Sequence, residues 1–261
     1  MLAPDVLERL RSFADGPEPR LLATDLDGTL APIVERPQDA RVPPTTLAVL
    51  DRLAQRVTVA VVTGRDLNTA RRMVPCEGVL VIGSHGLEAS FDSPFLPDVD
   101  RLRLAAALEE AEQRVLEAAP SVYLHIERKA ISTAFHYRTA PELEPLIRKA
   151  LTPLPEGLRL REGRMVLEVL PDAKGGKDAA LRALVDHVGA NSILTLGDDL
   201  TDVAMFRAAL SFRERGKVVV IGGVSGGPET PPAIAELSDF LLHSPDEVLE
   251  ALQFVARHLG V

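Results

Sequence analysis

Residues 21–30 read LLATDLDGTL, an apolar run that ends abruptly in two carboxylates and a glycine. This pattern is typical of a buried strand that reaches the surface at a turn. Side chains two apart on a strand share a face, so Asp25 and Asp27 are expected to point into one site. Because two such carboxylates repel each other, they indicate a nucleophile beside an acid, a metal site, or both. The alternative is an ordinary polar Asp-Gly turn at a strand end.

Three further apolar runs end in polar and glycine residues in the same way. Residues 57–62 precede Thr-Gly-Arg, residues 78–82 precede Gly-Ser-His-Gly, and residues 192–197 precede a cluster of acids. Helical patterns separate the runs, which predicts an α/β fold with a doubly wound, Rossmann-like parallel sheet of about six strands. Ligands of such sheets bind beyond the carboxyl ends of the strands. We therefore expect all these polar strand ends to face one crevice.

The pattern changes between residues 89 and 171. Strands predicted at residues 122–127 and 131–137 alternate apolar with polar side chains, as antiparallel strands with one open face do. Together with helices at 99–117 and 141–151 and a hairpin of 158–161 with 165–170, they give the order αββαββ. This order predicts an α+β cap domain, residues 89–171, inserted into a core formed by residues 1–88 and 172–261.

Composition excludes several classes of protein. The 261 residues include 29 Lys and Arg against 38 Asp and Glu, a formal net charge of −9, which argues against a general binder of nucleic acid or anionic membranes. No apolar stretch is long enough to cross a bilayer. The single cysteine, Cys76, cannot form an internal disulfide and is predicted to be buried rather than nucleophilic. A reducing, cytoplasmic location fits this best.

The polar strand ends have both chemical and purely structural interpretations. Asp198, Asp199 and Asp202 suit a metal ion, but acids at a helix start also cap the helix. Thr63 alone would be a strand end or a helix cap, whereas a hydroxyl beside free amides at a helix start suits an anion. Lys174 competes with Lys177 for contact with such an anion, and Lys177 is favoured because it opens the next helix.

In chain order, the polar groups resemble the four signature motifs of the haloacid dehalogenase superfamily of phosphotransferases. They are Asp-x-Asp-Gly-Thr at 25–29, Thr-Gly-Arg at 63–65, Lys177, and Gly-Asp-Asp-x-x-Asp at 197–202. The resemblance implies that Asp25 attacks phosphorus and becomes an aspartyl phosphate. It implies that Asp27 protonates the leaving oxygen and then deprotonates the water.

The same resemblance implies a magnesium cofactor. Asp25, the backbone carbonyl of Asp27 and Asp198 would be the protein ligands of Mg²⁺. Thr63 and Lys177 would hold the phosphoryl oxygens. The other two acids of the fourth motif, Asp199 and Asp202, would orient ligands, the lysine or waters.

Within the superfamily, the chain after about residue 20 resembles the trehalose-6-phosphate phosphatases. The resemblance rests on the extended first motif at 25–33, Ser-His-Gly-Leu-Glu at 84–88, Glu-Arg-Lys at 127–129, His-Tyr-Arg at 136–138, Val-Leu-Glu-Val at 166–169 and the fourth motif. It departs at Leu170, where the family often has arginine or lysine, and at Val203, where it usually has glutamate. The substrate-binding set that it implies is Arg65, His85, Gly86, Glu88, Glu127, Lys129 and Glu168.

The expected substrate is therefore the small sugar phosphate trehalose 6-phosphate, with no nucleic-acid or membrane partner and a monomeric chain. The alternatives within the fold are a phosphatase for sucrose phosphate or a glycosyl-3-phosphoglycerate, and a phosphosugar mutase. From another class, a catalytically silent sugar-phosphate sensor remains open. Such a sensor usually loses a nucleophile or a metal ligand, whereas this chain keeps Asp25, Asp27, Lys177 and Asp198.

Overall fold

The computed structural model describes residues 2–91, 101–119, 121–163, 165–173, 175–226 and 230–261. The chain forms two compact units, one from Met1–Leu96 with Gly175–Val261 and one from Pro97–Lys174. We call them the core unit and the cap unit. The predicted domain boundaries, after residues 88 and 171, stay a prediction.

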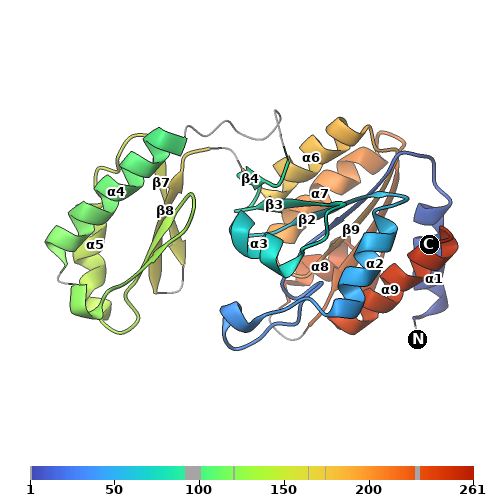
Figure 1. The fold of residues 1–261 in the computed structure, drawn as a ribbon, viewed down its shortest axis with the longest axis horizontal. Coiled ribbons are helices and arrows are strands. Elements are labelled where there is room, and N and C mark those ends of the chain that lie inside the picture. Colours follow the sequence, from blue (N-terminus) through green and yellow to red (C-terminus); the bar gives the residue numbers. More distant parts are fainter. Residues whose placement is uncertain (1, 92–100, 120, 164, 174, 227–229) are drawn as a thin grey trace. The chain divides into compact units, whose positions relative to one another are not determined.

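The core unit is built on a seven-stranded sheet whose two central strands come from distant parts of the chain (Figure 1). Six strands are parallel, and the short last strand is antiparallel to its neighbour. In spatial order the strands are β11 (Phe240–Leu242), β10 (Val218–Val224), β9 (Ser192–Gly197), β1 (Arg20–Thr24), β2 (Thr58–Val62), β3 (Val79–Gly83) and β4 (Glu88–Ala89). The predicted doubly wound sheet is confirmed, and β4 is the strand that the sequence did not predict.

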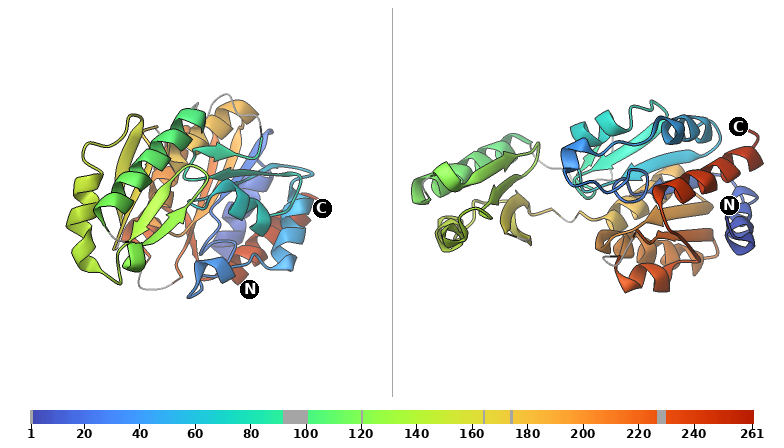
Figure 2. Two further views of the ribbon diagram at one scale, coloured as in Figure 1. Left: turned by 60° about the vertical axis from the view of Figure 1, so that its left-hand side comes forward. Right: turned by 90° about the horizontal axis from the view of Figure 1, so that it is seen from below.

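Helices pack on both faces of this sheet because its strands are apolar on both sides. One hydrophobic cluster lies under the helices α1 (Pro4–Ala14), α2 (Pro44–Leu53), α3 (Leu67–Met73) and α9 (Pro245–His258). The other lies under α6 (Lys177–Val188), α7 (Leu200–Arg213) and α8 (Pro232–Leu237). The first and last helices, α1 and α9, are in contact with each other (Figure 1), and Figure 2 shows the same core unit from two further sides.

Cys76 lies within the first of these clusters. Its side chain is buried, and burial raises the pKa of the thiol to about 12. Because the thiolate is the nucleophilic form of cysteine, this thiol is inert at neutral pH. The prediction of a buried, structural cysteine is confirmed.

The cap unit is a four-stranded antiparallel sheet with helices on one face (Figure 1). Its strands lie in the order β5 (His125–Arg128), β6 (Thr133–His136), β8 (Val166–Pro171) and β7 (Leu158–Gly163), and its helices are α4 (Arg101–Ala118) and α5 (Glu144–Ala150). Phe135, Leu167 and Val169 are fully buried on the helix-covered face. The opposite face carries Glu127, Arg161 and Glu168, whereas Arg128 and Glu162 lie on the helix side and pair with Glu112 of α4 and Arg148 of α5. The predicted αββαββ order and open face are confirmed.

Two predicted details of the cap unit differ from the structure. The strand expected from Val122 begins only at His125, because Val122 and Tyr123 lie in a 3₁₀ turn with 86% and 65% of their surface exposed. The hairpin expected to turn at residues 162–164 instead keeps residues 162 and 163 in β7, so that Gly163 pairs with Val166. The start of the helix predicted at residue 99 lies outside the described residues. Among the described residues, no helix combines the length and apolar character needed to span a membrane.

A buried hydroxyl in the centre of the sheet gives a stability prediction. Thr195 of β9 is fully buried, and its Oγ1 has no hydrogen-bond partner among the described residues. Replacing Thr195 with the nearly isosteric valine removes an unpaired polar group, so we expect Thr195→Val to raise the free energy of unfolding by about 1 kcal/mol. Urea denaturation measures this difference.

Thr24 on the neighbouring strand β1 is the matched control. It is equally buried, but its hydroxyl donates to the Asp25 carbonyl at 2.9 Å. Thr24→Val should therefore destabilise the protein, by about 1 kcal/mol. Equal destabilisation by both substitutions would show that Thr195 has a stabilising partner.

Candidate active site

Two of the predicted catalytic and metal-binding residues, Asp25 and Asp198, lie at the point where the strand order of the sheet reverses. Strands β1 and β9 are neighbours there, and the chain leaves β1 toward one edge of the sheet and β9 toward the other. Asp25 follows β1, and its amide donates to the Leu196 carbonyl of β9 at 2.9 Å. Asp198 follows β9 directly. The two acids therefore emerge side by side at the switch point, where doubly wound sheets bind ligands.

Gly28 allows these two strand ends to approach each other. Its φ of +83° lies in the left-handed region, and a Cβ at this position would lie 2.1 Å from Oδ2 of Asp198. The next residue, Thr29, donates its hydroxyl to Oδ1 of Asp198 at 3.4 Å. No other residue type satisfies both the backbone angle and this close approach. The Asp-Gly pair is thus part of the site rather than only a turn signal.

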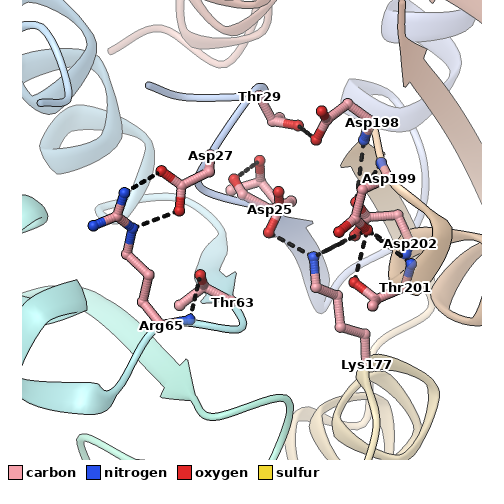
Figure 3. A network of polar contacts seen from close by, with 11 residues as sticks. Asp25, Asp27, Thr29, Thr63, Arg65, Lys177, Asp198, Asp199, Thr201 and Asp202 are labelled. Carbon is pink, nitrogen blue, oxygen red and sulfur yellow. Dashed lines mark hydrogen bonds and ion pairs between the residues drawn. The ribbon is translucent and has the colours of Figure 1, made fainter. Parts of the chain in front are cut away.

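Lys177, the first residue of α6, joins the acids (Figure 3). Its Nζ donates to Oδ1 of Asp25 at 2.6 Å and to Oδ1 of Asp202 at 2.8 Å, and its side chain is 1% exposed. Burial acts to lower the pKa of Lys177, but the charges of Asp25, Asp202 and Asp199 raise it above its usual value. The lysine is therefore fully charged. Its competitor Lys174 lies outside the described residues.

The acids of the fourth motif divide between capping and chemistry. Asp199 is the N-cap of α7 and accepts from the amides of Thr201 and Asp202 at 2.8 and 3.0 Å. Asp202 completes the capping box, because its Oδ2 accepts from the amides of Asp198 and Asp199, both at 3.1 Å. The capping interpretation thus applies to Asp199 and Asp202. Asp198 instead turns its carboxylate toward Thr29 and Gly28.

The carboxylates carry more negative charge than Lys177 balances. Oxygens of Asp25, Asp198 and Asp202 lie within 4.8 Å of one another. Burial raises the pKa of Asp198 to about 7, and the charges of Asp25 and Asp199 act in the same direction. Burial also raises the pKa of Asp25 and of Asp202, against the effect of Lys177. A divalent cation with oxygen ligands would relieve this repulsion, so the donor set fits Mg²⁺.

Of these three acids, Asp202 is the least suited to bind a cation directly. It already accepts three hydrogen bonds, from Lys177 and from two backbone amides. Asp25 and Asp198 remain as carboxylates that can turn toward an ion. This arrangement is consistent with the predicted division between ligands and supporting residues, which stays a prediction.

Asp27 faces a different partner from Asp25. Arg65 donates two hydrogen bonds to its carboxylate, from Nε at 2.6 Å and from Nη2 at 2.7 Å (Figure 3). Nη2 also donates to the Pro37 carbonyl at 2.8 Å. The sequence placed Arg65 with the substrate. The structure places Arg65 on the predicted general acid and base, where it fixes the direction of that carboxylate.

Thr63 follows β2 and is buried, and its Oγ1 accepts from the Arg65 amide at 3.2 Å. One part of the expectation for Thr63 is wrong. The amides at the start of α3 are not free, because the Thr69 amide donates to the cap residue Asp66 and the Leu67 amide donates to Glu88. An anion beside Thr63 therefore has to bind the hydroxyl and the loop before the helix.

The turn after β3 brings the predicted residues His85, Gly86 and Glu88 beside this loop. A Cβ on Gly64 would lie 2.5 Å from Cε1 of His85, so the imidazole lies directly against the Thr-Gly-Arg segment. Glu88 is 2% exposed and does not project from the surface. His85 is thus placed for contact with a ligand of the loop, whereas Glu88 lies beneath it.

In the cap unit, the predicted residues share the open face of the sheet. Strand register aligns Glu127, Ala134, Glu168 and Arg161 in one row across β5, β6, β8 and β7. Lys129 lies just beyond β5 and donates to Oε1 of Glu168 at 3.2 Å. The sequence therefore identified residues that do lie on one face.

Glu168 is the centre of this face. Its Oε1 accepts from Ser132 at 2.6 Å, and its Oε2 accepts from Nε of Arg161 at 3.1 Å. Burial acts to raise the pKa of Glu168, but the hydrogen bonds of Ser132 and Arg161 and the charges of Lys129 and Arg161 lower it to about 2. The carboxylate is fully ionised and orients both cations.

Sequence reasoning missed Ser132 and Arg161, and also His136, whose Nε2 lies 3.0 Å from Oε2 of Glu127. For Arg161, the missing signal was the register of the β7–β8 hairpin. With β7 extended through Gly163, Arg161 pairs with Glu168. The alternating pattern showed a face but not which side chains are opposite each other.

The lowered pKa of Glu168 predicts a pH-dependent stability of the cap unit. A carboxylate with a folded-state pKa of about 2 contributes stability above its unfolded pKa of 4.5, and this contribution is lost as pH falls toward 2. We expect Glu168→Gln to destabilise the cap unit at pH 7 by about 1–2 kcal/mol. The difference from the wild-type protein should shrink between pH 4.5 and pH 2.

Tyrosine fluorescence during denaturation of the full chain measures this effect. The chain has no tryptophan and two tyrosines, Tyr123 and Tyr137, which both lie in the cap unit. The exposed Glu109 of α4 provides the control Glu109→Gln, for which no change is expected. If Glu168→Gln changed the free energy of unfolding by the same amount at every pH, Glu168 would not be acting through its ionised carboxylate.

The chain is similar to known proteins in both sequence and fold. A sequence model of the family described as trehalose-phosphatase matches residues 23–234. Curated trehalose-phosphate phosphatases from Mycolicibacterium paratuberculosis and Mycobacterium tuberculosis are each 32% identical over 98% of this chain. The matches cover 67% and 66% of those proteins, so the chain spans about two thirds of their length.

Solved structures support the fold. Aspergillus fumigatus trehalose-6-phosphate phosphatase matches with a TM-score of 0.64 and 24% identity over 98% of both chains. The C-terminal domain of Candida albicans trehalose-6-phosphate phosphatase gives a TM-score of 0.67 and 22% identity over 98% and 97% of the chains. The C-terminal domain of a Candida albicans trehalose synthase regulatory protein also matches, with a TM-score of 0.64 at 14% identity over 94% and 97%. With its motifs in place at the switch point and the family model matched over most of its length, this chain belongs to the trehalose-phosphatase family.

Proposed function

We propose that this protein is a Mg²⁺-dependent phosphatase that hydrolyses trehalose 6-phosphate to trehalose and phosphate. The observation that carries the proposal is the group formed by the buried Asp25 and Lys177 with the partly buried Asp198 at the switch point of the sheet. Membership of the trehalose-phosphatase family supplies the substrate. A cytoplasmic location and a monomeric state remain expectations.

The first half of the reaction forms a covalent intermediate. An oxygen of Asp25 attacks phosphorus, the bond from phosphorus to the sugar oxygen breaks, and Asp27 gives a proton to that oxygen as trehalose leaves. Lys177, 2.6 Å from Asp25, is placed to neutralise both the nucleophile and the incoming phosphoryl oxygens. Thr63 contributes its hydroxyl to the same oxygens.

The second half restores the enzyme. Asp27, now ionised, takes a proton from water, which attacks phosphorus and breaks the bond to Asp25, so that inorganic phosphate forms. The two hydrogen bonds from Arg65 keep the Asp27 carboxylate in one orientation through both steps. Arg65 therefore supports the acid and base in addition to its predicted contact with substrate.

The ion would be held by Asp25, Asp198 and the backbone carbonyl of Asp27. Bound there, Mg²⁺ supplies the positive charge that allows a carboxylate to approach a phosphate dianion. Asp199 and Asp202 maintain the loop and the lysine around it, through the capping box and the Asp202–Lys177 ion pair.

Sugar recognition is proposed for His85 and Gly86 in the core unit and for Glu127, Lys129 and Glu168 in the cap unit. Sugars are recognised through hydroxyl groups that donate to carboxylates and accept from cations. The open face of the cap sheet offers both, with Glu168 holding Lys129 and Arg161 in place. Leu170, on the same strand as Glu168, adds an apolar side chain.

The nucleophile assignment gives a sharp prediction. Asp25→Asn should lower turnover by at least about a thousandfold, because an amide cannot form the phosphoryl intermediate. Lys177 retains its ion pair with Asp202, so the variant should remain folded. Phosphate release and circular dichroism measure the two effects. Asp186→Asn, an exposed acid of α6, is the control with full activity, and turnover by Asp25→Asn would rule out Asp25 as nucleophile.

Substrate and metal are tested together on a panel of sugar phosphates. We expect kcat/KM for trehalose 6-phosphate to exceed that for sucrose 6-phosphate and glucosyl-3-phosphoglycerate by about tenfold or more. Chelation with EDTA should abolish release, and added Mg²⁺ should restore it. Equal release from every ester would reject trehalose as the specific sugar, and no release from any would favour a sensor.

A further inference from the structure

The turn between β3 and β4 has an unusual backbone. Three consecutive residues lie in the left-handed region, Ser84 with φ 50°, His85 with φ 54° and Gly86 with φ 94°. Only the last of them is a glycine. Side-chain-bearing residues adopt this conformation at an energetic cost, and they keep it where the surrounding structure holds them there.

Backbone hydrogen bonds fasten this turn to the loop after β2. The Ser84 amide donates to the Arg65 carbonyl at 2.7 Å, and the His85 amide donates to the Thr63 carbonyl at 2.9 Å. The turn is therefore attached to the segment that carries Thr63, one of the two residues proposed to hold the phosphoryl oxygens.

Glycines mark close contacts on both sides of the turn. A Cβ on Gly64 would lie 2.5 Å from Cε1 of His85, and a Cβ on Gly86 would lie 2.8 Å from the Gly176 carbonyl oxygen. Gly176 immediately precedes Lys177. The turn thus lies between the segment of Thr63 and the start of the helix that carries Lys177.

Glu88 braces the turn from within the core unit. One carboxylate oxygen, Oε2, accepts both from the Ser84 hydroxyl at 2.7 Å and from the Leu67 amide of α3 at 3.2 Å. The residue is 2% exposed. Glu88 therefore links the strained turn to Leu67, the first residue of α3. It is too deeply buried to act chiefly on sugar hydroxyls.

We propose that Glu88 is a positioning residue for the phosphate-binding side of the site. Glu88 holds the turn 84–86 in its left-handed conformation. This turn then fixes the distance between the segment of Thr63 and the segment of Lys177. This inference rests on the proposed phosphatase function, and it assigns Glu88 a role other than direct contact with the sugar.

Binding of inorganic phosphate to the full-length protein in the presence of Mg²⁺, followed by calorimetry, tests the proposal. Glu88→Ala should weaken phosphate binding by about tenfold or more, as is usual when a supporting hydrogen-bond partner is removed. Glu88→Gln should bind nearly as well as the wild-type protein, because both donors share one oxygen that an amide carbonyl can replace. The exposed Glu77, just before β3, provides the control Glu77→Ala, with unchanged binding.

Kinetics separate positioning from sugar contact. If Glu88 positions the phosphate side, Glu88→Ala lowers kcat/KM by the same factor for trehalose 6-phosphate and for p-nitrophenyl phosphate, which carries no sugar. A loss confined to the sugar ester with unchanged phosphate affinity would overturn the proposal. Equal damage by Glu88→Gln and Glu88→Ala would also overturn it, because the carboxylate charge would then be what matters.

Two further measurements, on Ser84→Ala and on the melting temperature, keep the proposal testable if Glu88→Ala is unstable. Should Glu88→Ala fail to fold, Ser84→Ala removes one of the two donors and should give an intermediate loss of phosphate affinity, whereas unchanged affinity in that variant would contradict the proposal. A merely structural Glu88 would lower the melting temperature while phosphate affinity of the folded protein stayed constant. Wild-type protein that binds phosphate but does not hydrolyse trehalose 6-phosphate would refute the proposed substrate and leave the Glu88 measurement intact.

Discussion

The ion pairs of the buried Lys177 with Asp25 and Asp202 are the interaction on which the core unit and its site both depend. The three residues come from α6, the end of β1 and the first turn of α7, and sequence separations of 152 and 25 residues divide the lysine from its two partners. A charged group with 1% exposure must be paired, because an uncompensated buried charge costs several kcal/mol, roughly 3–5. Folding around this lysine therefore brings Asp25, the proposed nucleophile, into contact with the lysine and the acidic loop.

The same constraint explains why the site is suited to a cation. Satisfying Lys177 gathers more carboxylates than one ammonium group can balance, and the raised pKa of Asp198, about 7, records the excess. The capping box of α7 fixes Asp199 and Asp202 in supporting roles, and Gly28 gives Asp198 the space to approach the first motif. The fold thus assembles a cluster of carboxylates whose negative charge a divalent ion would balance. Neighbouring acids therefore have different roles: Asp199 and Asp202 cap the helix, whereas the side chain of Asp198 is free of the capping box.

Fold and activity are separate statements for this family. A regulatory protein of trehalose synthase shares the fold at 14% identity, so the arrangement of strands alone does not distinguish an enzyme from a regulator. The proposal of an enzyme therefore rests on particular side chains, namely Asp25, Lys177 and Asp198. In the cap unit, the corresponding feature is a row of opposite charges around Glu168 on the open face of the sheet. The other, apolar face of that sheet packs against the helices.

The sequence by itself determined the parallel sheet, the inserted αββαββ unit and the strand ends that carry the motifs, because hydrophobic periodicity and strand-end chemistry are local properties. It placed Asp25 and Asp198 at strand ends that face one crevice and put Glu127 and Lys129 on one face, with Glu168 in the same substrate-binding set. It did not find the contacts of Arg65 with Asp27, of Arg161 with Glu168, or of Glu88 with Ser84 and Leu67. Those contacts follow from hairpin register, from the left-handed turn after β3 and from loops that meet across glycines. Only the tertiary structure decided them, because a shift of one residue in register or one ångström in approach changes which side chains are opposite each other without altering the pattern along the chain.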